Sequence, residues 1–192
     1  TGQKRAILGP DLSHRRTLIS NILGSNAVQA VIDAETDGGS SRDKLLKRAS
    51  AHANEIVSHQ SYMVVRFFDV LLTWLWHKLY DGILVANVET VKHFAESHEI
   101  VYVPCHRSHI DYLLLSYVLY HNGLTPPHIA AGRNLNLPIV GALLRRAGAF
   151  FMRRSFQGDA LYRAVFDEYI HLIFIKGYSM EYFIEGGRSR TG

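Results

Sequence analysis

Six polar side chains crowd into one short stretch between two apolar runs. Residues 103–112 read VPCHRSHIDY, so a cysteine, two histidines, an arginine, a serine and an aspartate fall within seven consecutive positions. Polar groups are costly to bury beside apolar segments unless they are hydrogen-bonded. The stretch therefore indicates a metal site, the start of a helix, or a site of chemistry.

The spacing argues against a metal site. A dinuclear motif of the H-x-H-x-D-H type, with Asp111 as its aspartate, needs histidines where the chain has Arg107 and Tyr112. The H-E-x-x-H motif needs a glutamate at position 107 and fails as well. We therefore expect no metal.

A helix start explains part of the stretch. Ser108 and Asp111 resemble a capping box, with aspartate in place of glutamate, and predict a helix over 108–122 with Ser108 as its N-cap. His106 then precedes the helix, in a turn from which its ring can fold back onto Asp111. A carboxylate bonded to one imidazole nitrogen leaves the other as a base. We predict that His106 and Asp111 form such a pair, and that His109 is a packing or supporting group.

The single cysteine of the 192 residues, Cys105, precedes the predicted base. It could act as a nucleophile, but a lone cysteine at a strand end is more often a small buried apolar residue, and we expect that role. One cysteine excludes a disulfide within the chain and fits a reducing compartment.

The elements around the stretch predict a parallel sheet. After residue 97, short apolar runs bounded by glycine and proline alternate with segments of helical length. Strands are expected at 99–104, 128–132, 148–154 and 180–187, and helices at 108–122, 135–146 and 159–176. This alternation indicates βαβ units in an α/β fold, with helices flanking a mostly parallel sheet. Ligands of such sheets bind outside the carboxyl ends of the strands.

Polar clusters follow three of the four expected strands. The first strand is followed by CHRSHID, the third by Arg153 and Arg154, and the fourth by EGGRSR at 185–190. Only one of two successive side chains can point to a given face of a strand, whereas Arg188 and Arg190 alternate and could grip one anion. A His–Asp base facing arginines indicates acyl or proton transfer on a phosphorylated substrate. Unrelated surface arginines are the alternative.

Residues 1–97 predict an all-helical region. Its most apolar run, 62–85, is interrupted by charged residues such as Arg66, Asp69 and Lys78, which a spanning helix would bury. Two interpretations fit: a helix on a membrane surface, or a buried helix of the N-terminal region. The net charge of +4 suits a phosphate or lipid headgroup, and no basic run long enough for a nucleic-acid tail occurs.

Three blocks in order resemble the glycerolipid acyltransferases. His106-x4-Asp111 is similar to the family's first signature block, GAFFMRR at 148–154 to its second, and FIEGGRSRTG at 183–192 to its third. The flanking sequence over roughly 60–192 resembles the bacterial, membrane-bound branch that acylates glycerol 3-phosphate.

The resemblance implies an acyltransferase fold, no cofactor, and transfer of a fatty acyl group from acyl-CoA or an acyl carrier protein thioester to the sn-1 hydroxyl of glycerol 3-phosphate. This is the first step of phospholipid synthesis, at the cytoplasmic face of the bacterial inner membrane, by a peripheral or monotopic protein. His106 would be the general base and Asp111 its orienting partner. The positions that match substrate-binding residues of the family are Arg154, Glu185, Gly187, Arg188, Ser189 and Arg190.

Two rival functions stay open at this point. One is acylation of another phosphorylated acceptor, lysophosphatidate or dihydroxyacetone phosphate. The other is a phosphate- or membrane-binding module without catalysis. We divide the chain into a helical region, 1–97, and the N-terminal part of the acyltransferase domain, 98–192. The family's fourth block would follow residue 192, so we expect the chain to be a fragment of the enzyme.

Overall fold

Helices and short parallel strands alternate through the second half of the protein. A computed structural model describes residues 15–108 and 110–185. The helices are α2 (Arg15–Gly24), α3 (Asn26–Asp37), α4 (Arg42–Ile56), α5 (Tyr62–Leu79), α6 (Val88–Ala95), α7 (Asp111–His121), the 3-10 turn η1 (Arg133–Leu135), α8 (Val140–Ala147) and α9 (Ala160–Ile175). The strands are β1 (Val101–Tyr102), β2 (His128–Gly132), β3 (Ala149–Met152) and β4 (Met180–Glu181).

The strands form one parallel sheet in the order β1-β4-β2-β3, which confirms the predicted α/β fold. Strand β4 is central, because Glu181 is in register with Tyr102 of β1 and with Ile129 of β2. β1 and β4 are two residues long, much shorter than the runs expected at 99–104 and 180–187. Because every described strand pair is parallel, the carboxyl ends of the four strands lie at the same edge of the sheet.

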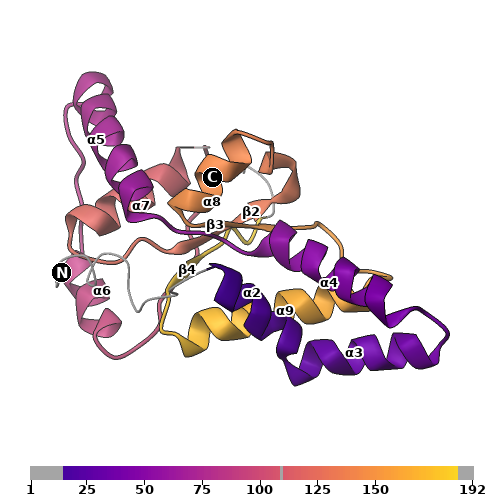
Figure 1. Ribbon diagram of the computed structural model, residues 1–192. Coiled ribbons are helices and arrows are strands. Elements are labelled where there is room, and N and C mark those ends of the chain that lie inside the picture. The colour runs from indigo at the N-terminus through magenta and orange to yellow at the C-terminus, as the bar shows by residue number, and fades with distance from the viewer. Residues whose placement is uncertain (1–14, 109, 186–192) are drawn as a thin grey trace.

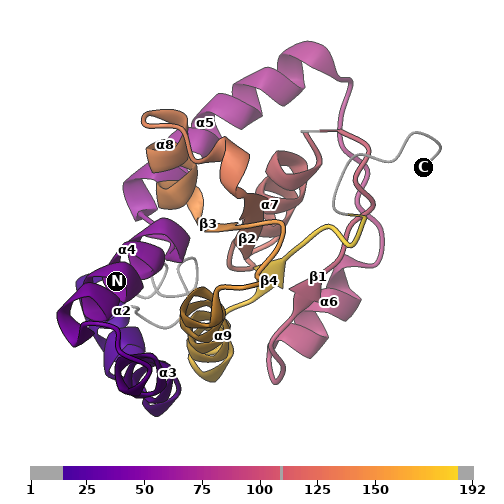
Figure 2. The same cartoon turned by 90° about the vertical axis from the view of Figure 1, so that its right-hand side faces the viewer.

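Two layers of helices cover the sheet. Helices α2, α3, α4 and α9 lie on one side, and α5, α7 and α8 lie on the other (Figures 1 and 2). The first layer joins the sheet through a core in which Tyr162 and Tyr169 of α9 and Phe150 of β3 are fully buried. On α2 to α4 the buried positions recur three or four residues apart, as an amphipathic helix requires. The predicted boundary near residue 97 falls between α6 and β1 and stays a prediction.

Helix α5 is apolar on more than the face it buries. Val65, Leu72 and Trp76 pack inward, whereas Trp74 is 59% exposed. The helix ends at Leu79, ahead of Gly82, rather than continuing through the apolar run to residue 85. Within the described part of the chain, none of the helices is both long and apolar enough to span a membrane.

Candidate active site

The turn after β1 is held together by the Asp111 carboxylate. Asp111 Oδ2 accepts hydrogen bonds from the backbone N–H groups of Arg107 (2.7 Å) and Ser108 (2.6 Å). These bonds to a charged acceptor are stronger than ordinary amide bonds, so Asp111 fixes the residues that follow His106 directly. The imidazole is thereby carried on a rigid turn at the start of α7.

The predicted capping box is only half formed. Asp111 does bond the Ser108 N–H, but the Ser108 hydroxyl accepts from the N–H of Ile110 (3.2 Å) rather than from that of Asp111. The helix begins at Asp111, three residues after the predicted N-cap. One oxygen of the aspartate accepts hydrogen bonds from two successive N–H groups of the turn, and the turn therefore stays outside the regular helix.

The first residues of the third signature block, 183–185, lie against the first block. The His106 ring stacks on the Phe183 ring with centroids 4.2 Å apart, and the His106 backbone N–H donates to Glu185 Oε1 (3.3 Å). Hydrogen bonds from the backbone N–H groups of Glu185 itself and of His106 lower the pKa of the Glu185 carboxyl. Glu185 thus has a structural contact with the turn that carries the predicted base. The hydrogen bond between the His106 imidazole and Asp111 stays a prediction.

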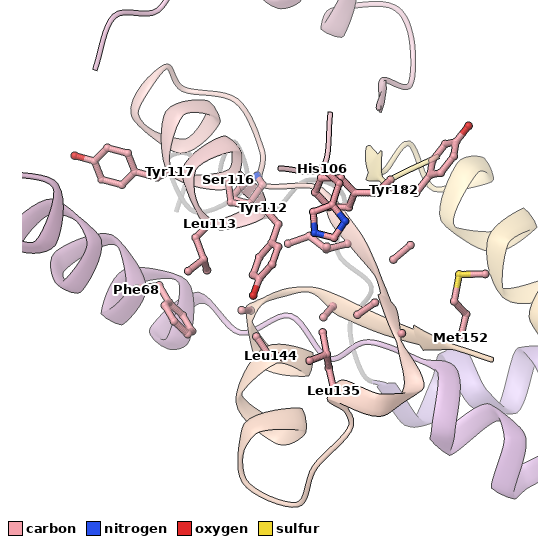
Figure 3. A pocket seen from close by; sticks show the side chains of 18 of the residues that line it. Phe68, His106, Tyr112, Leu113, Ser116, Tyr117, Leu135, Leu144, Met152 and Tyr182 are labelled. Carbon is pink, nitrogen blue, oxygen red and sulfur yellow. The ribbon is translucent and has the colours of Figure 1, made fainter. Parts of the chain in front are cut away.

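A cavity of about 610 Å³ opens beside His106. Its wall is mainly apolar and comes from α5, α7, α8 and the sheet, with Phe68, Leu113 and Leu144 among the lining residues. Figure 3 shows the His106 imidazole pointing into this space, with Phe68 and Tyr117 on the side away from it. The arrangement places the imidazole at one end of an apolar chamber, and such a chamber suits a long apolar ligand.

The other end of the cavity carries a polar cluster. Asp69 of α5, which lines the cavity, pairs with Arg66 (2.6 Å) and with His121 at the end of α7 (2.7 Å). Arg66 also donates to the hydroxyl of Tyr120 (3.2 Å). These contacts connect α5 to α7, and they mark the limit of the apolar part of the cavity.

The two arginines after β3 have different environments. Arg153 donates two bonds to the Glu55 carboxylate (2.9 Å each) and one to Asp159 (3.1 Å). The bonds with Arg153 are the main cause that lowers the pKa of Glu55. Arg154 is exposed, lines the cavity and makes no salt bridge with the described residues. Of the pair, Arg154 is the one available to a ligand.

Several predicted site residues cannot be placed. His109 and four residues of the third block lie outside the described residues: Gly187, Arg188, Ser189 and Arg190. Their predicted roles stay predictions. Within residues 15–108 and 110–185, no group of three or more histidine, cysteine, aspartate or glutamate side chains is arranged to hold a metal.

One expectation about this stretch is wrong, and some wall residues were missed. Cys105 is exposed rather than buried, because the chain leaves the sheet after Tyr102 and position 105 already lies in the turn. Tyr112, Ser116 and Phe183 contact the cavity but were not predicted as site residues. Their helix or strand was expected, but α7 is apolar all round, so its periodicity does not indicate which face lines a cavity.

Known proteins similar to this chain are acyltransferases. The sequence profile of the family described as Acyltransferase matches residues 82–192. Proteins named glycerol-3-phosphate acyltransferase are 59% identical in Pseudomonas savastanoi pv. phaseolicola, 58% in Pseudomonas aeruginosa and 57% in Ectopseudomonas mendocina. The matches cover 98–99% of this chain but 23% of each relative. The chain therefore spans less than a quarter of the length of these curated relatives.

Proposed function

The chain belongs to the acyltransferase family, and we propose that it forms part of the catalytic domain of an enzyme that acylates the sn-1 hydroxyl of glycerol 3-phosphate. The observation that carries the proposal is the position of His106, whose ring faces an apolar cavity of about 610 Å³ with Arg154 on its wall. The cavity can hold a fatty acyl chain, His106 can activate the hydroxyl that attacks the acyl carbonyl, and Arg154 can bind a phosphate.

His106 acts as the general base. One imidazole nitrogen takes the proton of the sn-1 hydroxyl as that oxygen attacks the thioester carbonyl. The new C–O bond forms, the tetrahedral intermediate collapses with loss of the C–S bond, and the imidazolium returns the proton to the leaving sulfur. Asp111 supports this cycle: its Oδ2 already holds the turn, and in the reacting complex its other carboxylate oxygen accepts a hydrogen bond from the second imidazole nitrogen.

The acyl group passes directly between substrates, without an acyl-enzyme. The exposed Cys105 thiol is near the reacting end of the cavity, but it bonds to the Glu185 carboxylate. A base positioned on the acceptor hydroxyl makes a cysteine nucleophile unnecessary. In this mechanism Cys105 is not a nucleophile, and its thiol serves the turn through its hydrogen bond to Glu185.

The phosphate of the acceptor binds to arginine. Arg154 supports this assignment because it is exposed at the cavity, whereas Arg153 is bound to Glu55 and Asp159. Arg188 and Arg190 complete the phosphate site in the proposal, since paired guanidinium groups match phosphate geometry. The acyl donor is a thioester of coenzyme A or of an acyl carrier protein.

An exposed apolar face supports attachment to a membrane surface. We define the apolar face as largely exposed residues of α5 and of the segment that leads into the neighbouring α8: Met63, Phe67, Val70, Trp74, Leu137, Ile139 and Val140. Contiguous exposed apolar residues of this kind mark interaction surfaces. The same two helices wall the cavity, so lipid-derived chains would reach it from that side. We propose the cytoplasmic face of the bacterial inner membrane, with peripheral or monotopic attachment.

An acceptor competition assay tests the proposed function. The full-length protein that contains this chain is supplied with palmitoyl-CoA or palmitoyl carrier protein and with glycerol 3-phosphate, dihydroxyacetone phosphate or lysophosphatidate. We expect glycerol 3-phosphate to be acylated at its sn-1 hydroxyl in preference to both rivals. Preference for another acceptor, or binding of phosphate without turnover by a folded protein, would overturn the proposal.

A further inference from the structure

The carboxylate of Glu55, in the last turn of α4, holds the arginine that directly follows β3. Its Oε1 and Oε2 accept hydrogen bonds from Nε and Nη2 of Arg153, each 2.9 Å long. Two parallel charge-assisted bonds of this kind are strong and fix the direction of the guanidinium. The side chains are 17% and 24% exposed, so salt screens this pair less than a surface pair. Glu55 thus connects α4 firmly to the second signature block, although it belongs to none of the three blocks.

The remaining parts of Arg153 are also held. Its Nη1 donates to Asp159 Oδ2 (3.1 Å), and its Nη2 lies 3.2 Å from Nδ1 of His52. The guanidinium carbon lies 4.1 Å from the centre of the Tyr162 ring, and the Tyr162 hydroxyl accepts from the backbone N–H of Arg153 (3.2 Å). Residues of α4 and of the start of α9 therefore fix both the side chain and the backbone of Arg153.

Anchoring Arg153 leaves Arg154 on the side of the cavity. Helices α4 and α9 pack together on one side of the sheet, and the helices that wall the cavity, α5, α7 and α8, lie on the other (Figures 1 and 2). Successive side chains at the end of a strand point to opposite faces. Both arginines border the cavity, but the guanidinium of Arg153 is occupied by α4 and α9, whereas Arg154 is exposed.

We propose that Glu55 is a positioning residue for the acceptor site: by holding Arg153, it sets the direction in which Arg154 enters the cavity. The role rests on the proposed function, in which Arg154 binds the phosphate of glycerol 3-phosphate. A guanidinium must be placed accurately to bind a phosphate through two parallel bonds. Without the Glu55 carboxylate, Arg153 loses its two-bond partner and the backbone that carries Arg154 can shift. The helical layer therefore shapes the phosphate site without touching the substrate.

Steady-state kinetics of Glu55→Gln in the full-length enzyme test this role. The amide keeps the size of the side chain, but its NH2 group cannot accept a bond from Arg153 and its oxygen carries no charge. With glycerol 3-phosphate and palmitoyl-CoA, the acceptor KM should rise about tenfold because a binding group is misplaced, while kcat and the donor KM stay within about threefold. Binding of glycerol 3-phosphate, measured by calorimetry, should weaken by a similar factor.

A double variant separates positioning from a general structural effect. Once Arg154→Ala has raised the acceptor KM, adding Glu55→Gln should raise it by no more than about twofold, because Glu55 acts through the side chain already removed. A purely structural effect of Glu55 would add in full. Glu35→Gln is the matched control: its carboxylate pairs with Arg48 of α4 (3.3 Å) instead of Arg153, so its kinetic constants should equal those of wild type.

Three results would overturn the proposal: an unchanged or lower acceptor KM in folded Glu55→Gln, an equal rise in the acceptor and donor KM, or full additivity in the double variant. If Glu55→Gln does not fold, Glu55→Asp, which draws the carboxylate back from Arg153, is judged by the same criteria. Failure of the proposed function is distinguishable, because the wild type would then not acylate glycerol 3-phosphate, or Arg154→Ala alone would leave the acceptor KM unchanged.

Discussion

The buried imidazole of His128 should make the fold sensitive to acid. His128, the first residue of β2, is 1% exposed, and its Nδ1 lies 2.9 Å from the Ser58 hydroxyl oxygen. That oxygen accepts from the hydroxyl of Tyr169 (2.9 Å), so Ser58 has its own proton to donate to Nδ1. The network joins the end of α4 to β2 and α9, and it requires a neutral ring.

Burial lowers the pKa of His128 from 6.5 to about 4. An unfolded chain titrates this histidine near 6.5, so between the two values the unfolded state binds more protons than the folded one. The contribution of His128 to the free energy of unfolding is therefore fully present above pH 6.5, and it is lost as pH falls towards 4. At about 1.4 kcal/mol per pKa unit, the fall of roughly 2.5 units amounts to about 3 kcal/mol. Because the ring is fully buried, solvent screening does not reduce this figure.

Urea unfolding between pH 4 and pH 8 measures the effect. In His128→Asn the amide oxygen can accept the Ser58 proton but does not titrate, so the free energy of unfolding should fall by about 3 kcal/mol less than in wild type between pH 7 and pH 4. His171→Asn, an exposed site on α9, is the control and should follow wild type. Equal acid losses in wild type and His128→Asn would refute the reasoning.

Three further changes address the site and the surface. Replacing Phe67 and Trp74 together by Ser should weaken flotation of the full-length protein with anionic vesicles about tenfold or more, since both belong to the exposed apolar face; unchanged flotation would indicate that other parts of the protein cover it. Leu113→Phe fills the cavity and should favour shorter acyl donors by about tenfold in relative kcat/KM, which donor competition measures. Cys105→Ala should retain near-normal turnover, and a loss of turnover by the folded variant would indicate covalent catalysis.

Strand limits were predicted best where a proline or a turn residue stands at the end of the strand. β2 runs over 128–132 as expected, because Pro127 precedes it and the turn at Arg133 follows it. β1 and β4 are shorter than predicted, since pairing at the edge strand β1 extends over two residues only. Helix α6 lies in the region that was expected to be helical, but its position was not predicted: none of its residues is buried, so it lacks the strong apolar periodicity by which helices are found.

Site residues that belong to sequence motifs could be predicted, whereas residues that line the cavity through the packing of helices could not. His106, Asp111, Arg154 and Glu185 come from polar clusters at strand ends, and the structure describes all four around one edge of the sheet. The cavity wall could not be derived, because facing residues of α5 and α7 are apolar on several sides. Trp74 and Trp76 illustrate this: two positions apart, one is exposed and the other is buried.

The central claim is that His106 is the general base, and turnover by His106→Ala tests it most directly. The full-length variant is compared with wild type for kcat with glycerol 3-phosphate and palmitoyl-CoA, alongside glycerol 3-phosphate binding by calorimetry. General-base catalysis is worth about 10²–10⁴ in rate, so kcat should fall by at least about a hundredfold while the acceptor still binds. A folded His106→Ala variant with near-normal kcat would contradict the account.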